Sequence, residues 1–243
     1  MKSLFMSALL IMLIISACSE QTDEKSDSVS QVNSEPDTAQ SITDHPCGIL
    51  SRAEIDSIKQ AVQDMTVDQV QKDEFAVLET SMGDIVVKFF PEIAPKHCRS
   101  FKRLAVSGFF NCTYFHRIIK GFVIQGGDIL TRDDSPNNDG TGGPGYTVPA
   151  EFNDTSHDLG ILSMARSSDP NSAGSQFFIC LSREKTKALD GNYTVFGRVV
   201  KGLDVVQKIG NVAVEANPMT GEPSFPVEHV YLYRVYMIND GSL

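Results

Sequence analysis

One stretch of this chain constrains its fold and chemistry more than any other: Phe115–Asp128, which reads FHRIIKGFVIQGGD. It sets a permanent cation, Arg117, and an amide, Gln125, among phenylalanine, isoleucine and valine side chains. Burying an unpaired guanidinium is costly, so an arginine in such a run needs a local purpose. The alternative is an ordinary core strand whose arginine extends along apolar surface to reach water. The stretch by itself leaves both interpretations open.

Two further segments favour the functional interpretation. One comprises Gly160–Ala165 (GILSMA) and Asn171–Ile179 (NSAGSQFFI), and the other is Leu189–Gly197 (LDGNYTVFG). With the first stretch, and in this order and spacing, they resemble the cyclophilins, which are peptidyl-prolyl cis–trans isomerases. One such motif would be weak evidence, whereas three in order are specific. The resemblance extends from about Phe75 to the C-terminus.

The hydrophobic pattern of residues 75–243 fits the fold that the resemblance implies. Two alternating segments around a short turn indicate a hairpin, two segments read as helices, and the chain ends in a strand pattern. These elements are expected at Phe75–Thr80 and Asp84–Phe90, at Pro95–Val106 and Leu203–Ile209, and at Val227–Ile238. Many short strands with two helices are typical of a closed antiparallel barrel. The pattern thus favours a mainly β domain with an extra N-terminal helix, and the resemblance to the cyclophilins implies a closed eight-stranded antiparallel β-barrel capped by two α-helices.

The first residues resemble a bacterial lipoprotein signal. Lys2 precedes an apolar run, Leu4–Ile15, which is short for a membrane span and ends in small residues followed by Cys18. The resemblance implies that residues 1–17 are removed and that Cys18 is acylated. The mature protein would then be anchored by lipid in the bacterial cell envelope, on the periplasmic or the outer-surface side. An ordinary secretory signal with an incidental cysteine is the alternative.

Two segments separate this signal from the domain. Residues 18–45 contain many acidic and polar side chains and almost no large apolar ones, a composition that predicts a flexible tether. Residues 46–74 are expected to form a helical extension. Ser51 and Glu54 match a capping box, and apolar residues recur at helical spacing, so a helix is predicted over residues 51–72. This helix could pack on its own domain, contact a partner or pair two copies, and the first of these is favoured.

Four cysteines follow Cys18 in the chain: Cys47, Cys98, Cys112 and Cys180. An exported protein would meet conditions in which disulfides persist. Four cysteines allow three complete pairings, and the sequence does not choose among them. We hypothesise a bridge between Cys98 and Cys112, which flank the first predicted helix of the domain. Cys180 is expected to be a small core residue of a buried strand.

The activity that the resemblance implies needs little chemistry from the protein. Rotation about an X–Pro bond breaks amide conjugation and has a barrier of about 20 kcal/mol. In the twisted state the prolyl nitrogen regains its lone pair, so a hydrogen-bond donor aimed there stabilises the transition state more than the planar ground state. Arginine suits this role because it keeps its proton and presents several N–H groups in a fixed fork. A pocket for the proline ring completes the requirement, and no cofactor is expected.

Carried over position by position, the resemblance assigns roles to ten residues. The catalytic residues are expected to be Arg117, Phe122 and Gln125. The substrate-binding residues are expected to be Val123, Ala165, Arg166, Gln176, Phe178, Leu189 and Tyr193. Three features depart from the common family pattern: Arg166 replaces an asparagine, Tyr193 stands where many relatives have histidine, and the chain has no tryptophan. The tryptophan position of cyclosporin-sensitive relatives aligns near Ala188, so we expect cyclosporin binding to be weak.

Other classes of function have little support. The net charge of −10 and the lack of a basic patch argue against nucleic acid as a partner. The segment Gly140–Gly145 matches a dinucleotide-binding pattern, but no buried strand precedes it. In cyclophilins a similar Gly-rich loop lines the substrate groove. The histidines show no ligand spacing, so no metal site is predicted.

The sequence thus predicts a peptidyl-prolyl cis–trans isomerase that accelerates X–Pro rotation in exported, folding proteins. Its partners are expected to be proline-containing unfolded or partly folded polypeptides. Two alternatives use the same fold without catalysis: a proline-peptide binder or holdase, and an envelope scaffold with the 51–72 helix as its interaction surface. The presence of Arg117, Phe122, Gln125 and Phe178 together disfavours the binder, because a pure binder would not need the arginine.

Overall fold

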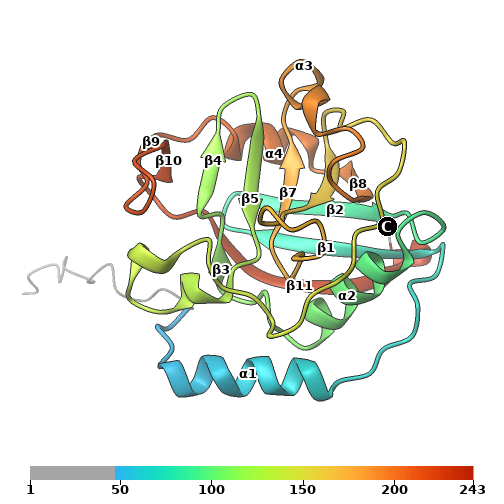
Figure 1. Cartoon of the computed structure of the whole chain (residues 1–243), viewed down its shortest axis with the longest axis horizontal. Helices are drawn as coiled ribbons and strands as arrows, with labels where there is room; N and C mark the ends of the chain where they lie inside the picture. The colour runs from blue at the N-terminus through green and yellow to red at the C-terminus, as the bar shows by residue number, and fades with distance from the viewer. Residues whose placement is uncertain (1–46, 243) are drawn as a thin grey trace, which may run out of the picture. The chain divides into compact units, whose positions relative to one another are not determined.

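A curled antiparallel sheet dominates the fold of residues 47–242, which are the residues that this computed structural model describes. Its nine strands are β1 (Glu74–Thr80), β2 (Gly83–Phe89), β3 (Thr113–Tyr114), β4 (Arg117–Ile119), β5 (Val123–Gly126), β6 (Ile161–Met164), β7 (Phe177–Cys180), β8 (Val195–Lys201) and β11 (Tyr231–Asn239). They pair in the order β3-β11-β1-β2-β8-β6-β7-β5-β4. Two further strands, β9 (Val214–Ala216) and β10 (Pro223–Pro226), form a separate hairpin (Figure 1). The predicted signal peptide, the tether and Cys18 lie outside the described residues.

The two edge strands of the sheet are joined by a very short connection. β3 and β4 stand at opposite ends of the strand order, yet only Phe115 and His116 separate them in the chain. The sheet must therefore curl until its edges approach each other. The curl encloses a core whose largest fully buried side chains are phenylalanines: Phe101, Phe109, Phe110, Phe115, Phe177 and Phe196. The expected mainly β fold is confirmed. The described sheet has nine strands where eight were expected, because the two-residue β3 adds to its edge.

Two helices pack against the sheet where the sequence predicted them. α2 (Pro95–Val106) begins with proline, which lacks the N–H that the first helical turn leaves unpaired. Its buried face packs against β8 and β11, whereas α4 (Leu203–Ile209) packs against β2. Figure 1 shows α2 below β1 and α4 above β2. Shorter helical segments are α3 (Arg183–Thr186) and the 3-10 turns Ile129–Arg132, Pro136–Asn138, Lys187–Leu189 and Asp240–Ser242.

The N-terminal helix is shorter than the sequence predicted. α1 (Arg52–Asp64) begins with the expected capping box, in which Ser51 and Glu54 exchange side-chain to backbone hydrogen bonds. The prediction that the helix continues to residue 72 is wrong. Met65 has extended backbone angles, with φ −76° and ψ 135°, and residues 65–71 form a non-helical segment that we call the strap.

The strap ends the helix because it makes contacts of its own with the domain. Arg99 in α2 donates from Nε to the Val67 carbonyl oxygen at 2.9 Å, and Val70 is buried. Ile55 and Val62 of α1 are fully buried against the main core, which confirms that this helix packs on its own domain. Within residues 47–242 no helix is both long and apolar enough to cross a membrane.

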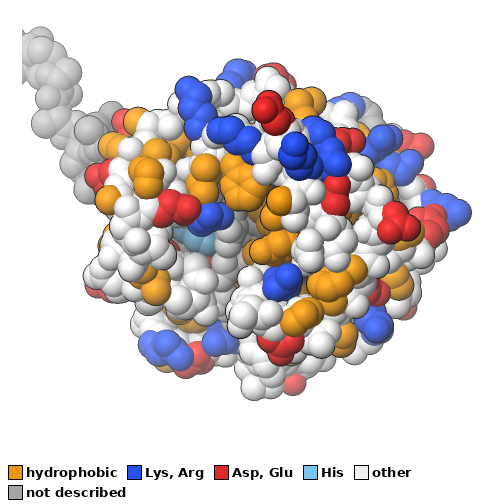
Figure 2. Space-filling model, turned by 45° about the horizontal axis from the view of Figure 1, so that its top comes forward, with side chains coloured by type: hydrophobic (Ala, Val, Ile, Leu, Met, Phe, Trp, Pro, Cys, Tyr) orange, Lys and Arg blue, Asp and Glu red, His pale blue; other side chains and the backbone are white. Residues whose placement is uncertain are grey.

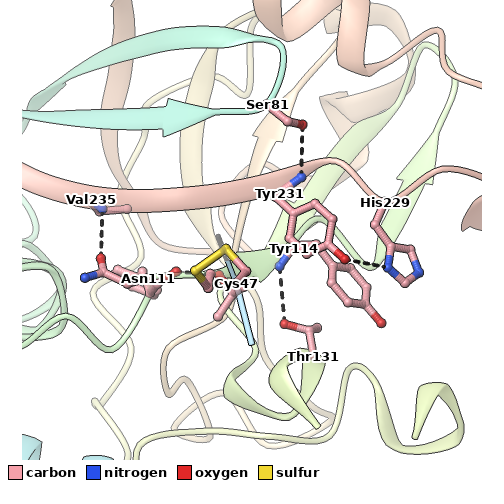
Figure 3. The surroundings of a disulfide bond; sticks show 11 residues. Cys47, Ser81, Asn111, Tyr114, Thr131, His229, Tyr231 and Val235 are labelled. Atoms are coloured by element: carbon pink, nitrogen blue, oxygen red, sulfur yellow. Dashed lines mark hydrogen bonds between the residues drawn. A yellow bond between two sulfur atoms is a disulfide. The ribbon is translucent and has the colours of Figure 1, made fainter. Parts of the chain in front are cut away.

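A disulfide fixes the start of the described chain to the domain. It joins Cys47 to Cys112, whose Cα atoms are 5.2 Å apart, and Figure 3 shows it beside β11. The hypothesis of a Cys98–Cys112 bridge is therefore wrong. α2 turns Cys98 into the core, where its thiol donates to the Phe196 carbonyl oxygen at 3.4 Å and cannot reach the surface. Cys180 is a free, buried residue of β7, as expected.

Candidate active site

Three neighbouring strands set the key side chains in one row. Arg117 of β4 lies opposite Gln125 of β5, and Gln125 lies opposite Phe178 of β7. Directly opposed residues point to the same face of a sheet. The intervening Ile118 and Ile124 are buried in the main core. The alternation of the β4–β5 hairpin therefore brings the arginine, the amide and the phenylalanine together outside that core.

A cavity of about 170 Å³ lies at this row. Nine of the ten residues assigned from the sequence line it: Arg117, Phe122, Val123, Gln125, Ala165, Arg166, Phe178, Leu189 and Tyr193. Val123 and Phe178 are buried, and the partly buried Phe122, Leu189 and Tyr193 pack against them. Six of the nine lining side chains are apolar or aromatic and three are polar, a mixture that is common in small ligand pockets. Figure 2 shows hydrophobic side chains gathered in a hollow, with basic and acidic side chains beside it.

The tenth residue, Gln176, lines an adjoining groove of about 450 Å³. Its side-chain oxygen accepts from Gln125 Nε2 at 3.0 Å, and its own Nε2 donates to the carbonyl oxygens of Gly140 and Gly142 at 2.9 Å each. The Gly-rich loop is also held from beneath by the buried Asp128, which accepts from the N–H groups of both glycines. The Gly-rich loop, Gly140–Gly145, lines this groove as expected, and Gln176 connects the loop to the cavity.

The wall of the cavity behind Phe178 depends on a buried histidine that the sequence did not single out. His157 stacks on the Phe178 ring with centroids 6.0 Å apart, and Tyr193 packs edge-on against the same ring at 5.7 Å. The imidazole of His157 lies 3.0 Å from a carboxylate oxygen of Asp190 and 3.0 Å from the Ser163 hydroxyl. Burial lowers the pKa of His157, so the ring is neutral at neutral pH. Its role is to pack against Phe178.

The guanidinium of Arg117 has two partners. Glu222 accepts from Nε at 2.7 Å and from Nη2 at 3.1 Å, and the Gln125 side-chain oxygen accepts from Nη1 at 3.4 Å. The hydrogen bonds and charge of Arg117 hold the pKa of Glu222 below its usual value, so Glu222 is ionised at neutral pH. Sequence reasoning missed Glu222, which lies 105 residues away in a segment with no recognisable motif.

His116, next to the arginine, is a buried neutral residue. Burial, and next the charge of Arg117, lower the pKa of His116 to about 4. Its ring lies beneath the Gly-rich loop, where a Cβ added to Gly140 would be 3.6 Å away.

Comparison with known proteins agrees with this geometry. A family model described as "Cyclophilin type peptidyl-prolyl cis-trans isomerase/CLD" matches residues 75–232, more than half of the chain. The chain belongs to the cyclophilin family. This cyclophilin is 40% identical over 173 residues to "Peptidyl-prolyl cis-trans isomerase-like 1" of Aspergillus fumigatus, a match that covers 68% of this chain and 96% of the relative. It is 40% identical over 149 residues to a "Probable peptidyl-prolyl cis-trans isomerase" of Brucella abortus, covering 59% and 75%.

A solved structure leads to the same family. The Cryptosporidium parvum cyclophilin type peptidyl-prolyl cis-trans isomerase, crystallised in the presence of the dipeptide Ala-Pro, shares 31% identity with a TM-score of 0.59. The match covers 68% of this cyclophilin and 99% of that chain. Family and relatives together make this cyclophilin a peptidyl-prolyl cis–trans isomerase, which accelerates rotation about X–Pro bonds. Residues 47–242 contain no cluster of three or more histidine, cysteine and acidic side chains that could hold a metal ion.

Proposed function

We propose that Arg117 is the hydrogen-bond donor of this isomerase and that Phe122, Phe178 and Leu189 hold the proline ring. Twisting the X–Pro amide makes the prolyl nitrogen pyramidal, and its lone pair then accepts a hydrogen bond that the planar amide cannot accept well. A guanidinium at the cavity rim meets this need without any change in its own protonation. The substrate main chain would lie along Ala165, Arg166 and Gln176, with Gln125 orienting the arginine.

The observation that carries this proposal is the single row of Arg117, Gln125 and Phe178 across three paired strands. Strand pairing fixes the distance between the donor and the apolar pocket, so the donor does not depend on a mobile loop. Preorganised donors stabilise transition states because little reorganisation is needed during the reaction. The same row disfavours a binder without catalytic activity, since the proline ring alone would be held by the apolar residues.

The test is the rate of cis–trans exchange in a succinyl-Ala-Ala-Pro-Phe anilide with purified full-length protein. Arg117→Ala is expected to lower kcat/KM by roughly 100-fold, the usual cost of removing one preorganised donor. Arg198→Ala is the matched control, because Arg198 is exposed on β8 and is not among the residues that line the cavity. Arg117→Ala with the turnover of the control would overturn the proposed mechanism.

We further propose that the protein is exported and anchored by lipid on Cys18, and that its substrates are exported chains that are still folding. The short apolar run that ends in small residues and Cys18 supports the anchor. The Cys47–Cys112 bond supports an oxidising compartment, since such bonds are rare in reducing ones. X–Pro bonds of unfolded chains hold a substantial cis fraction, so an isomerase finds substrates there.

Cell fractionation tests the anchor. The parent chain is expected in the membrane fraction, with a mass that includes acyl groups on Cys18, and Cys18→Ala is expected in the soluble fraction. Cys180→Ala serves as the control, because that cysteine is buried in β7. A parent chain that is soluble after signal cleavage would show an ordinary secretory signal instead.

A further inference from the structure

The hairpin that carries Glu222 is rigidly built. Asn217 is buried, and its side-chain oxygen accepts from the N–H groups of Met219 at 2.9 Å and Thr220 at 3.1 Å. The Asn217 N–H in turn donates to the Glu222 carbonyl oxygen at 2.7 Å, which closes the turn between β9 and β10. Gly221 supplies the positive φ, +70°, that this tight turn requires. The main chain of Glu222 is therefore fixed before its side chain meets any partner.

The hairpin is also fixed relative to the active site. β10 packs against β4, the strand that carries Arg117. Phe225 of β10 is buried and packs edge-on against the Tyr114 ring, with centroids 6.4 Å apart. Ser224 is completely buried. The carboxylate of Glu222 thus approaches the guanidinium from a rigid support rather than from a free loop.

The contact uses one edge of the guanidinium and leaves another available. Nε and Nη2 of Arg117 form the side edge of the planar fork, and both donate to Glu222. Nη1 and the second N–H of Nη2 form the end edge, on which residues 47–242 give only the long 3.4 Å contact from Nη1 to Gln125. A guanidinium held by its side edge therefore presents its end edge to the cavity that Arg117 lines.

Exposure indicates that this pair serves orientation rather than stability. The Arg117 side chain is 30% exposed and the Glu222 side chain 37%. Ion pairs of such exposure contribute little to folding, because water already solvates both charges. Two parallel hydrogen bonds nevertheless restrict the plane of the guanidinium, which a single amide contact from Gln125 does not do.

We propose that Glu222 is a positioning residue for catalysis: it clamps the side edge of Arg117 so that the end edge faces the prolyl amide. This inference rests on the proposed role of Arg117. It predicts that loss of the clamp affects the transition state more than substrate binding, because the apolar pocket for the proline ring stays intact. It also predicts that Glu222 acts only through Arg117.

The test compares Glu222→Gln with Glu215→Gln in purified full-length protein. Glu215 is exposed on β9 of the same hairpin, so its substitution removes the same charge nearby without touching Arg117. NMR exchange measurements on a proline tetrapeptide yield kcat and KM separately. Glu222→Gln is expected to lower kcat about tenfold with little change in KM, less than the roughly 100-fold that a misplacement of about 1 Å can cost. Glu215→Gln is expected to match the parent, and all three proteins should have equal Tm.

Combining each glutamate variant with Arg117→Ala makes the test decisive. If Glu222 acts through the arginine, Glu222→Gln changes nothing in the Arg117→Ala background. A faster Glu222→Gln enzyme would show that the carboxylate competes with substrate for the guanidinium, and equal rates for the two glutamine variants would show that the clamp is dispensable. Either result overturns the inference while Arg117→Ala still loses activity. If Arg117→Ala itself stays active, the proposed function fails instead.

Discussion

At the scale of single residues, His116 shows how burial fixes a protonation state. Its folded pKa of about 4 lies below the ordinary value of 6.5, because burial and the neighbouring Arg117 both disfavour the imidazolium. Above the ordinary value both the folded and the unfolded imidazole are neutral. As the pH falls from there towards 4, the unfolded chain binds a proton that the folded chain does not bind. The free energy of unfolding must therefore decrease over this range.

Urea unfolding of the parent and of His116→Gln checks this effect. Between about pH 7.5 and about pH 5, the parent is expected to lose about 2 kcal/mol more than the variant, as 1.36 kcal/mol per pKa unit implies. Other acid-sensitive groups contribute equally to both proteins, so only the difference between the two losses is assigned to His116. Equal losses in parent and variant would show that the folded protein protonates this ring as readily as the unfolded chain.

The residues that could be predicted are those that act within a local pattern. Arg117, Gln125 and Phe178 lie in motifs whose spacing survives in the sequence, and the strand register then brings them into one row. Glu222 and His157 could not be predicted, because both lie outside those motifs and reach the site through tertiary packing alone. Neither stands in a pattern that distinguishes it from an ordinary surface acid or core histidine.

At the scale of elements, the pairing of the cysteines was the feature least predictable from the sequence. The choice among pairings depends on which cysteines a helix turns inward, and α2 buries Cys98. The hairpin and the helices of the domain were predictable because alternation and helical spacing are local. The end of α1 could not be predicted. The helix ends before Met65 and the strap follows, and the contact of the strap with Arg99 leaves no signal in the local sequence pattern.

Cys47→Ser is expected to destabilise the protein. The bond closes a separation of 65 residues, and the chain-entropy model gives about 4 kcal/mol for a loop of that size. Denaturant unfolding without reductant should show this loss in Cys47→Ser and in Cys112→Ser alike. In reductant, the parent and both variants should coincide. An unchanged midpoint in Cys47→Ser without reductant would mean that the unfolded chain gains no freedom from losing the bond.

At the scale of the whole molecule, the sheet order explains why motif order alone predicted the architecture. The chain threads the sheet so that β3 and β4, consecutive in sequence, become its two edges. When only two residues join the two edge strands of an antiparallel sheet, the edges must lie close together, so the sheet curls. The strand count was less predictable, because a two-residue strand such as β3 leaves no hydrophobic pattern of its own.

The disulfide also makes part of the chain a covalent ring. Between Cys47 and Cys112 lie α1, the strap, β1, β2 and α2, and most strap residues are exposed. A protease that cuts the strap opens this ring but separates nothing, because the two sulfur atoms still join the fragments. Anything attached ahead of Cys47 would stay connected to the isomerase domain after such a cut. Detachment at this point requires two events of different chemistry, hydrolysis and reduction.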